Sequence, residues 1–236
     1  WWITDASGRV LKSGRLKTQR IGNYGVFPLG TFQYMLNSVT APQKLTIHLS
    51  VGDKVHNSWD IWVYPHHKDL TPDVLYTTTY DAKAKQYLQE GKKVVLCPKP
   101  NKVKGRKSVF HNHFWNPIMF KWAPTTLGCL IHADQPMFAD FITEKHLDWQ
   151  WWDILTNAKV IDMTDTPQEL RPFIQVIDSY ETNQKLGIGF EARVNNGKLL
   201  VLAVDTRKDL DKRPATQQLL KSIDQYVKSG QFAPRA

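Results

Sequence analysis

The sequence predicts an α/β protein with an all-β module at its N-terminal end, and three observations lead to that fold class. At 236 residues the chain is long for one domain and comfortable for two. Up to residue 65, short runs of β-branched and aromatic residues are separated by turn signals, which is typical of a β-sandwich. From about residue 70, strands alternate with helices, which is typical of layered α/β proteins.

The first part ends in two well-marked strands. Residues 44–51 alternate as a half-buried antiparallel strand does, with aliphatic side chains expected on one face. Residues 58–64 carry large side chains on both faces, so we expect both faces to be covered. The polar segment that follows predicts a boundary between Tyr64 and Thr71. The sequence therefore divides into two domains, 1–65 and 70–236.

The second part has a regular order of elements. Asp81 and Gly91 supply the start and stop signals of its first helix, which makes 74–97 a βαβ unit. Asn196-Gly197 supplies the turn of a tight hairpin. The closing helix, 214–229, is amphipathic, with Leu219 on its inner face. Strands are expected at 74–79, 93–97, 127–133, 159–163, 173–178, 186–194 and 199–204, and helices at 81–90, 136–142, 146–157 and 214–229.

Composition and charge exclude several classes of protein. Hydrophobic residues at 42% and charged residues at 22% exclude long disorder and a disulfide-dense miniprotein. No apolar run approaches the roughly 18 residues of a membrane-spanning helix, so we expect a soluble chain with no membrane partner. The net charge of +9 favours acidic partners, but the basic run 99–107 has no aromatic for base stacking, so nucleic acid is not expected. The chain begins within a predicted strand and without Met, which indicates a piece of a longer polypeptide.

The sequence contains no complete catalytic apparatus. It has no Gly-x-Ser-x-Gly or Gly-x-Cys-x-Gly elbow, no His-Glu-x-x-His and no phosphate-binding glycine loop. Cys97 ends a predicted strand, but Pro98 lacks the N–H that an oxyanion hole takes from the residue after a nucleophile. The histidine pairs at 66–67 and 111–113 lack the spacing and partner cysteines of a metal site. We therefore assign no catalytic residue, no metal and no cofactor.

Tryptophan is the unusual feature, because the chain contains nine. A Trp ring serves either as core or as a platform for a sugar ring. In the predicted helix 146–157, Trp151 shares the inner face, whereas Trp149 lies about 160° around from Leu147. We expect Trp149 to face a pocket, a neighbouring domain or a partner; the alternative is that a loop around Trp115 covers it. The candidate carbohydrate- or interface-binding residues are Trp149, Trp152, His146, Glu144, Trp115 and His113.

Several motifs carry a resemblance to one family. They are NSWDIWVYP at 57–65, FITEKH at 141–146, WQWWD at 149–153, QVID at 175–178 and GKLLV at 197–201. In this order they resemble the C-terminal region of Bacteroidetes-type glycoside hydrolase family 2 proteins, which are β-galactosidase-like. The resemblance covers nearly the whole chain.

The resemblance implies an immunoglobulin-like sandwich followed by a flavodoxin-like or amidotransferase-like α/β domain that has lost its elbow cysteine. The family's acid/base glutamate follows an asparagine, and this chain has no Asn-Glu dipeptide, so no catalytic residue is carried over. The implied function is that of a non-catalytic C-terminal part of a secreted or periplasmic enzyme of carbohydrate degradation. This part would support the catalytic domain or substrate cleft, or mediate homo-oligomerisation. Its partners would be the preceding catalytic barrel and an oligosaccharide.

Two other functions stay open at this point. The chain could be a stand-alone carbohydrate-binding module, in which case several Trp rings should be exposed and coplanar. It could also be an amidotransferase-like hydrolase that uses Cys97 or Cys129, in which case a thiol should lie beside a histidine at a strand end. The exposure of the Trp and Cys side chains separates these alternatives.

Overall fold

The computed structural model describes residues 1–17, 19–20, 22–65, 74–108, 110, 126–156, 158–179 and 182–235. It is a mixed α/β protein with an all-β sheet in its N-terminal part and, in its C-terminal part, a second sheet with few helices. Contacts within the chain divide it into two compact units, an N-terminal unit (Trp1–His66) and a C-terminal unit (His67–Ala236). None of the helices in the described ranges is long and apolar enough to span a membrane.

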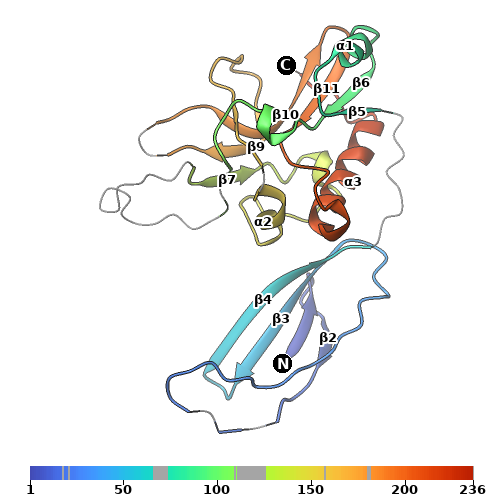
Figure 1. Ribbon diagram of the computed structural model, residues 1–236. Coiled ribbons are helices and arrows are strands. Elements are labelled where there is room, and N and C mark those ends of the chain that lie inside the picture. The colour runs from blue at the N-terminus through green and yellow to red at the C-terminus, as the bar shows by residue number, and fades with distance from the viewer. Residues whose placement is uncertain are drawn as a thin grey trace. The chain divides into compact units, whose positions relative to one another are not determined.

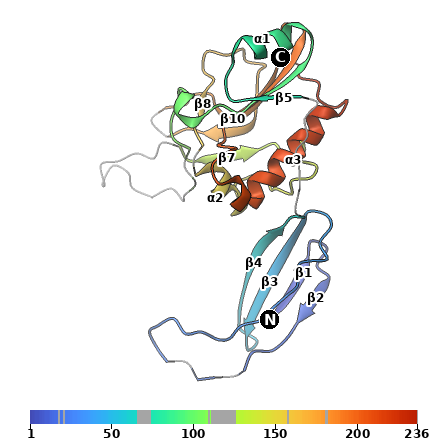
Figure 2. The same ribbon diagram turned by 45° about the vertical axis from the view of Figure 1, so that its right-hand side comes forward.

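The N-terminal unit contains one antiparallel sheet with the strand order β2-β1-β3-β4 (Figure 2). Its strands are β1 (Trp2–Asp5), β2 (Val10–Ser13), β3 (Gln43–Val51) and β4 (Val55–Val63). β3 and β4 pair along their whole length, from Gln43 opposite Val63 to Val51 opposite Val55. This long hairpin therefore forms the frame of the unit.

The core of the N-terminal unit lies on one face of this sheet. Ile3, Leu45 and Val63 are buried there, and Phe32 from the long connection between β2 and β3 packs against them. The alternation in β3 thus holds near Leu45. Nearer the β3–β4 turn the side chains are not buried, since Val51 and Trp59 are exposed. The expectation that both faces of residues 58–64 would be covered is wrong for Trp59, which is exposed although its cross-strand partner Ile47 packs against the core.

The C-terminal unit contains a seven-stranded mixed sheet with the order β5-β6-β11-β10-β9-β7, in which β8 pairs with β10. β5, β6 and β11 are parallel to one another, whereas the pairs β11–β10, β10–β9, β9–β7 and β10–β8 are antiparallel. The strands are β5 (Leu75–Thr77), β6 (Lys93–Leu96), β7 (Gly128–Ile131), β8 (Ile161–Asp162), β9 (Pro172–Ile177), β10 (Leu186–Val194) and β11 (Gly197–Leu202).

Helix α1 (Ala82–Gln89) begins and ends as the sequence predicts. The Asp81 carboxylate accepts a hydrogen bond from the Ala84 N–H (2.9 Å), which caps the helix start. Gly91 adopts a φ of +77°, a conformation that favours glycine and stops the helix. Because α1 joins the parallel strands β5 and β6, the predicted βαβ unit is confirmed.

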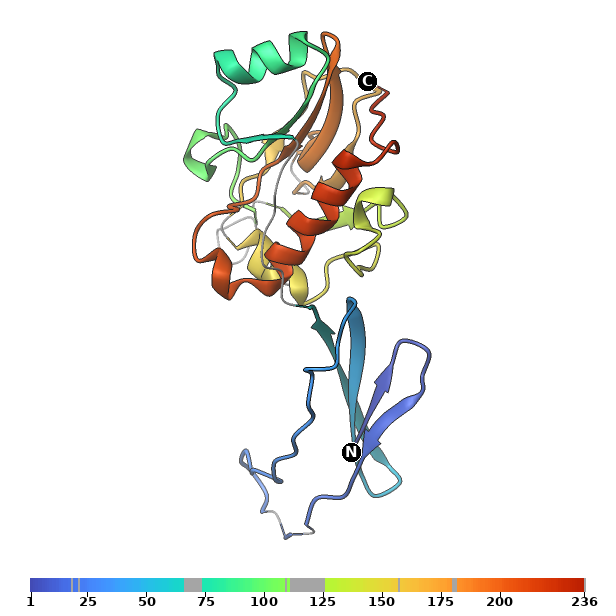
Figure 3. The same cartoon turned by 90° about the vertical axis from the view of Figure 1, so that its right-hand side faces the viewer.

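Helices cover both faces of the parallel strands. Leu75, Val94 and Leu199 form one row across β5, β6 and β11, and they pack with α1. In the neighbouring row, Tyr76 points to the opposite face, where its hydroxyl donates to Asp224 Oδ1 (2.9 Å) of α3 (Pro214–Lys228). α1 and α3 therefore lie on different sides of the sheet (Figure 3). The amphipathic prediction for α3 is confirmed, since its inner residues, Leu219 included, are buried.

Two helices are shorter in the structure than the sequence predicts. Residues 136–142 form only a 3₁₀ turn, η2 (Pro136–Phe138), and residues 146–157 give only α2 (Gln150–Leu155). The chain before α2 runs beside β7 instead: the Ile131 N–H donates to the Lys145 carbonyl (2.9 Å), and His146 forms a β-bridge with Leu130. Pairing with a strand thus prevents the first predicted turn of helix. α2 then lies next to α3 (Figure 1).

The β10–β11 turn is closely packed against α1. The predicted hairpin is confirmed, but the assignment of its turn to Asn196-Gly197 is wrong. β10 ends at Val194 and pairs there with Gly197, the first residue of β11, so the turn is Asn195-Asn196 and the positive φ of +53° belongs to Asn195. A Cβ added to Gly197 would lie 2.6 Å from both Leu88 Cα and the Lys92 carbonyl oxygen. Both are backbone atoms, so the clash cannot be relieved by rotating a side chain.

We expect Gly197→Ala to reduce the free energy of unfolding by about 1–3 kcal/mol through this overpacking. The matched control is Gly230→Ala, because nothing lies within 4 Å of the position of its Cβ. The control should change stability by less than about 0.5 kcal/mol. Urea unfolding of the two variants measures both values, and equal losses would contradict the packing argument.

Candidate functional site

The start of α2 is held by a compact set of hydrogen bonds. Asp148 accepts from the Gln150 backbone N–H through Oδ1 (3.2 Å) and from the Gln150 side-chain amide through Oδ2 (3.0 Å). The same amide donates to the Ile142 carbonyl (2.6 Å). These bonds satisfy a buried amide and a partly buried carboxylate together, so they fix where the helix begins.

The three tryptophans at this helix start have different surroundings. Trp151 is fully buried, its indole N–H donates to Thr143 Oγ1 (2.8 Å), and its ring packs edge-on against Phe141 (5.3 Å between centroids). Trp149 is 75% exposed and Trp152 is 54% exposed. Residues three apart are neighbours on a helix surface, so the two exposed indoles lie one turn apart on the side away from the core.

Phe110 extends this surface. Its ring lies 5.8 Å from that of Trp149, tilted by 51°. We call Phe110, Trp149 and Trp152 the aromatic patch. An exposed surface that carries large aromatic side chains is typical of an interaction site.

The remaining candidate residues have different outcomes. Glu144 and His146 are exposed, and both lie in the extended segment before α2. His146 forms its bridge with Leu130, whose own side chain is exposed. Trp115 and His113 lie outside the described residues, so the alternative of a covering loop around Trp115 stays open.

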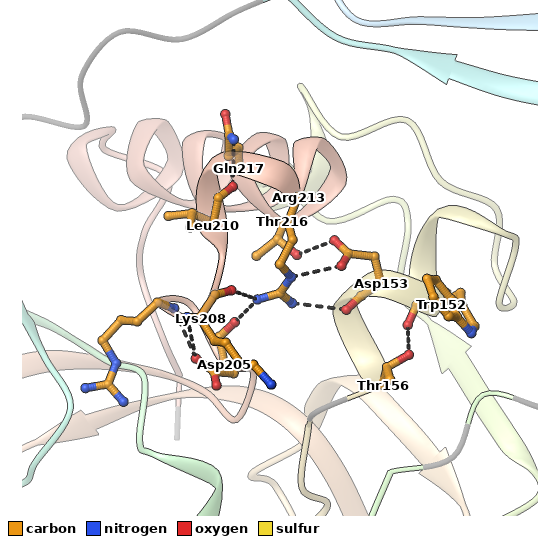
Figure 4. Close-up of polar contacts among 10 residues, drawn as sticks. Trp152, Asp153, Thr156, Asp205, Lys208, Leu210, Arg213, Thr216 and Gln217 are labelled. Atoms are coloured by element: carbon orange, nitrogen blue, oxygen red, sulfur yellow. Dashed lines mark hydrogen bonds and ion pairs between the residues drawn. The ribbon is translucent and has the colours of Figure 1, made fainter.

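A buried guanidinium beside α2 holds the helix in place (Figure 4). Arg213 is 6% exposed and donates from Nε to Asp153 Oδ1 (2.9 Å) and from Nη2 to the Asp153 carbonyl (3.0 Å). Thr216 Oγ1 of α3 donates to Asp153 Oδ2 (3.0 Å). In Figure 4 the Trp152 ring extends away from this network. Both carboxylate oxygens of Asp153 are thus hydrogen-bonded within the unit, whereas the indole of the preceding Trp152 is exposed.

Asp148 is the residue of the site whose pKa is shifted. Burial raises the pKa of its carboxyl above the usual value, and the nearby Glu144 charge adds to this effect, whereas the hydrogen bonds from Gln150 act against it. The site therefore contains the carboxyl group of Asp148, whose ionised form is destabilised by burial, and the exposed carboxylate of Glu144.

The two cysteines are poor nucleophiles. Burial raises the pKa of Cys97 to about 12 and that of Cys129 to about 12. Both thiols are consequently protonated near neutral pH, and the thiolate is the reactive form. In the part of the chain that the structure describes, no group of three His, Cys, Asp or Glu side chains is placed to hold a metal ion.

Sequence reasoning missed three hydrophobic residues, Phe110 of the aromatic patch and Leu130 and Ile177 of the β7–β9 pair. Phe110 follows a basic segment and has no periodic neighbours that would mark it. Leu130 and Ile177 are both exposed. They share one face of the β7–β9 pair, since Leu130 lies opposite Gln175 and Ile177 lies opposite Gly128, two residues along each strand. Strict alternation with the buried Cys129 and Ile131 was the signal that could have found Leu130.

Comparison with protein families gives two matches. Residues 75–236 match a family described as a domain of unknown function, DUF8487. The chain belongs to the DUF8487 family. Residues 1–65 match a second domain of unknown function, DUF8488. A search among curated proteins finds no match to the chain. The aromatic patch lies entirely within the DUF8487 region.

We expect Trp151→Ala to reduce the free energy of unfolding by about 3–5 kcal/mol, as is typical when a buried aromatic is removed. Trp149→Ala should cost less than about 1 kcal/mol, because its ring is mostly in water. Equilibrium unfolding of the 236-residue chain in urea compares the two. A loss for Trp149→Ala as large as that for Trp151→Ala would show that Trp149 belongs to the core.

The raised pKa of Asp148 predicts a specific pH dependence. Folding favours the protonated carboxyl, so this contribution to stability is full below the unfolded pKa of about 3.9 and is lost as the pH rises through the folded pKa. Between about pH 4 and pH 7, Asp148→Asn should therefore gain stability relative to the unsubstituted chain. Urea unfolding across that range measures the difference, and parallel pH profiles would contradict it.

Proposed function

We propose that this chain is the non-catalytic C-terminal part of a secreted, β-galactosidase-like glycoside hydrolase of family 2. In this proposal the aromatic patch contacts the catalytic part of the same polypeptide, and the chain supports that part during carbohydrate degradation. The proposal joins the sequence resemblance to the exposed surface at the start of α2.

One observation carries the proposal: Trp149 is 75% exposed on a helix start that is otherwise rigidly held. Trp and Tyr are enriched at the energetic centres of protein interfaces. A preorganised backbone beneath an exposed indole reduces the entropy lost on association. Both properties favour a stable contact with another protein surface.

The chemistry of the described residues supports a role without catalysis. Glycoside hydrolysis normally uses two positioned carboxylates. Glu191 accepts a hydrogen bond from the Tyr226 hydroxyl (2.7 Å) and is half-buried against α3, while Asp153 is engaged by Arg213. The protonated, buried thiols likewise argue against an amidotransferase-like hydrolase.

The finer fold assignments belong to the same proposal. We assign the N-terminal unit to an immunoglobulin-like type because its sheet is antiparallel and built around the long β3–β4 hairpin. Its described residues form one sheet, which departs from a sandwich of two facing sheets. We assign the C-terminal unit to a flavodoxin-like or amidotransferase-like type because β5, α1, β6 and β11 form a parallel α/β layer. The antiparallel strands β10, β9 and β7 depart from a fully parallel flavodoxin-like sheet.

A carbohydrate-binding function of the same patch is the second candidate. Trp149 and Trp152 are both exposed, and the flat face of an indole packs well on the C–H face of a sugar ring. The two candidates differ in what the patch binds, namely protein in the first case and oligosaccharide in the second.

The first test is the reading frame upstream of Trp1. The proposal expects a barrel-sized segment with a pair of glutamates, whereas a start codon immediately before Trp1 contradicts it. The isolated 236-residue chain should not hydrolyse a nitrophenyl β-galactoside. Turnover that disappears in Glu144→Gln or Glu191→Gln would overturn the non-catalytic assignment.

The second test measures binding of the upstream segment to this chain by titration calorimetry. The double variant Trp149→Ala/Trp152→Ala should weaken association at least about tenfold, as expected for aromatic residues at an interface centre. The matched control is Trp59→Ala, which removes an indole that is 49% exposed in the N-terminal unit. The control should change affinity less than about twofold. If the double variant instead abolishes binding of galactotetraose and leaves association unchanged, the patch is a sugar platform.

A further inference from the structure

The strand β4 forms one outer edge of the N-terminal sheet, with no strand beside it among the described residues. Edge strands of monomeric proteins are commonly short, irregular or charged with Lys, which prevents pairing with other chains. The opposite edge follows this rule, since β2 has four residues, includes Lys12 and pairs irregularly with β1. By contrast, β4 has nine residues, contains no Lys or Pro and pairs with β3 without a register shift. β4 is therefore an open edge.

The hydrogen bonds of β1 determine which backbone groups of β4 point outward. The Asp5 N–H donates to the Arg9 carbonyl (3.1 Å), and the Trp1 carbonyl accepts from the Gly14 N–H (2.9 Å), so both are directed toward β2. Successive residues of a strand direct their backbone groups to opposite sides, so the even-numbered residues of β1 face β3. Following the register from β1 to β3 and on to β4, the odd-numbered residues of β4 face β3 and its even-numbered residues face outward.

The outward groups of β4 belong to His56, Ser58, Asp60 and Trp62. The Ser58 N–H donates to Oδ1 of the adjacent Asn57 (2.9 Å), which agrees with its outward direction. The outward N–H groups of the other three residues have no acceptor in the part of the chain that the structure describes. The edge thus presents a row of backbone donors and acceptors to which another strand can be added.

The sequence of β4 fits an antiparallel copy of itself. When two β4 strands pair over their full length, Trp59 lies opposite Trp59 on the two-fold axis, and Val55 lies opposite Val63. The one acidic residue of the strand, Asp60, then lies opposite Ser58, whose hydroxyl can donate to the carboxylate. No two like charges face each other in this register.

Neighbouring registers fit less well. An axis at Asp60 would place two carboxylates directly opposite each other, which is destabilising. An axis at Ser58 would leave Trp62 and Val63 without partners. Pairing about Trp59 therefore uses the whole strand and avoids charge repulsion.

Trp59 supplies the apolar contact of such a pair. Its side chain is 49% exposed, although it shares a face of the sheet with Ile47, which packs against the core. Across the two-fold axis the two indoles would lie beside each other, and aromatic pairs directly opposite one another stabilise antiparallel strands. A second copy of this chain is thus the occupant that the side chains of the edge favour.

We propose that two copies of this chain associate through β4, edge to edge and antiparallel about a two-fold axis at Trp59, so that their N-terminal sheets join into one continuous sheet. The interface is isologous, because each copy contributes the same strand. It uses no residue of the aromatic patch and does not rest on the proposed function. A failure of the contact at Trp149 therefore leaves this proposal in place, and the reverse also holds.

Disulfide trapping in the whole 236-residue chain tests the position of the axis. In an antiparallel pair, opposite residues that exchange no backbone hydrogen bond have Cα atoms about 4.5 Å apart, a separation that a disulfide bridges. Trp59→Cys should therefore form a covalent dimer under mild oxidation, measured by non-reducing electrophoresis. The native Cys97 and Cys129 are buried, so they should not compete.

The matched control for the trapping experiment is Val55→Cys. Val55 is exposed on the same strand, but in the proposed register it lies opposite Val63 and about 26 Å from its own counterpart. Trp59→Cys should give at least about tenfold more covalent dimer, because its two thiols are held together at a high effective concentration. Equal yields from the two variants, or no covalent dimer of Trp59→Cys, would overturn the register.

Sedimentation velocity of the whole chain tests the association without a covalent bond. The unsubstituted chain should form dimers at about 100 μM, a concentration that populates even weak interfaces. Trp59→Lys should raise the dissociation constant of the dimer at least about tenfold, because Lys is a side chain with which natural edges prevent pairing and would face a second Lys across the axis. The matched control is Val10→Lys, at a 55% exposed position of the opposite edge strand β2, with an expected effect below about twofold.

Ser58→Pro tests the backbone of the edge separately. It removes an outward N–H but no hydrogen bond to β3, and an edge strand tolerates Pro at such a position, so the variant should fold and fail to dimerise. Thermal unfolding verifies that each variant is folded. A monomeric unsubstituted chain, or a dimer that persists unchanged in both Trp59→Lys and Ser58→Pro, overturns the proposal. A monomeric chain in which Trp59→Lys instead weakens binding of the upstream segment would assign the edge to that segment and likewise overturn it.

Discussion

The buried guanidinium of Arg213 is the interaction on which the arrangement of the C-terminal unit depends. It directly precedes α3, it binds the side chain and the backbone of Asp153 in α2, and it donates to the carbonyls of Asp205 and Lys208 beyond β11. A charge this deeply buried requires nearly all of its donors to find acceptors, and losing one partner leaves an uncompensated charge. α2 and the loop between β11 and α3, whose contacting residues are 60 apart in sequence, therefore have to meet at one side chain.

The position of α2 explains why its aromatic residues divide as they do. With Asp153 tied to Arg213 and Gln150 tied to Asp148 and Ile142, the short helix cannot rotate. Trp151 then fills the core, and Trp149, on the other side of the segment, stays exposed. A single exposed tryptophan is ordinary on a protein surface, but here two are exposed three residues apart, and Phe110 lies against one of them. The rigidity of the core thus produces the exposed patch.

The C-terminal unit displays two exposed indoles, Trp149 and Trp152, in the aromatic patch. Exposed aromatic side chains of this size are typical of the energetic centres of protein interfaces. The patch is built within a single unit, so the proposal for it depends only on local geometry.

The sequence by itself determined the elements whose signals are local. Asp81 and Gly91 delimit α1, and the apolar spacing of α3 identifies its buried face. The β10–β11 hairpin was also predicted, but one residue too late, since its positive φ is at Asn195. The sequence also indicated that Trp149 and Trp151 lie on different sides of one segment. The tertiary structure decided what depends on long-range pairing: the antiparallel half of the second sheet, the late start of α2 beside β7, and the contact of Phe110 with Trp149. Periodicity reports which face of a segment is apolar, but it contains no information about which distant segment will lie against that face.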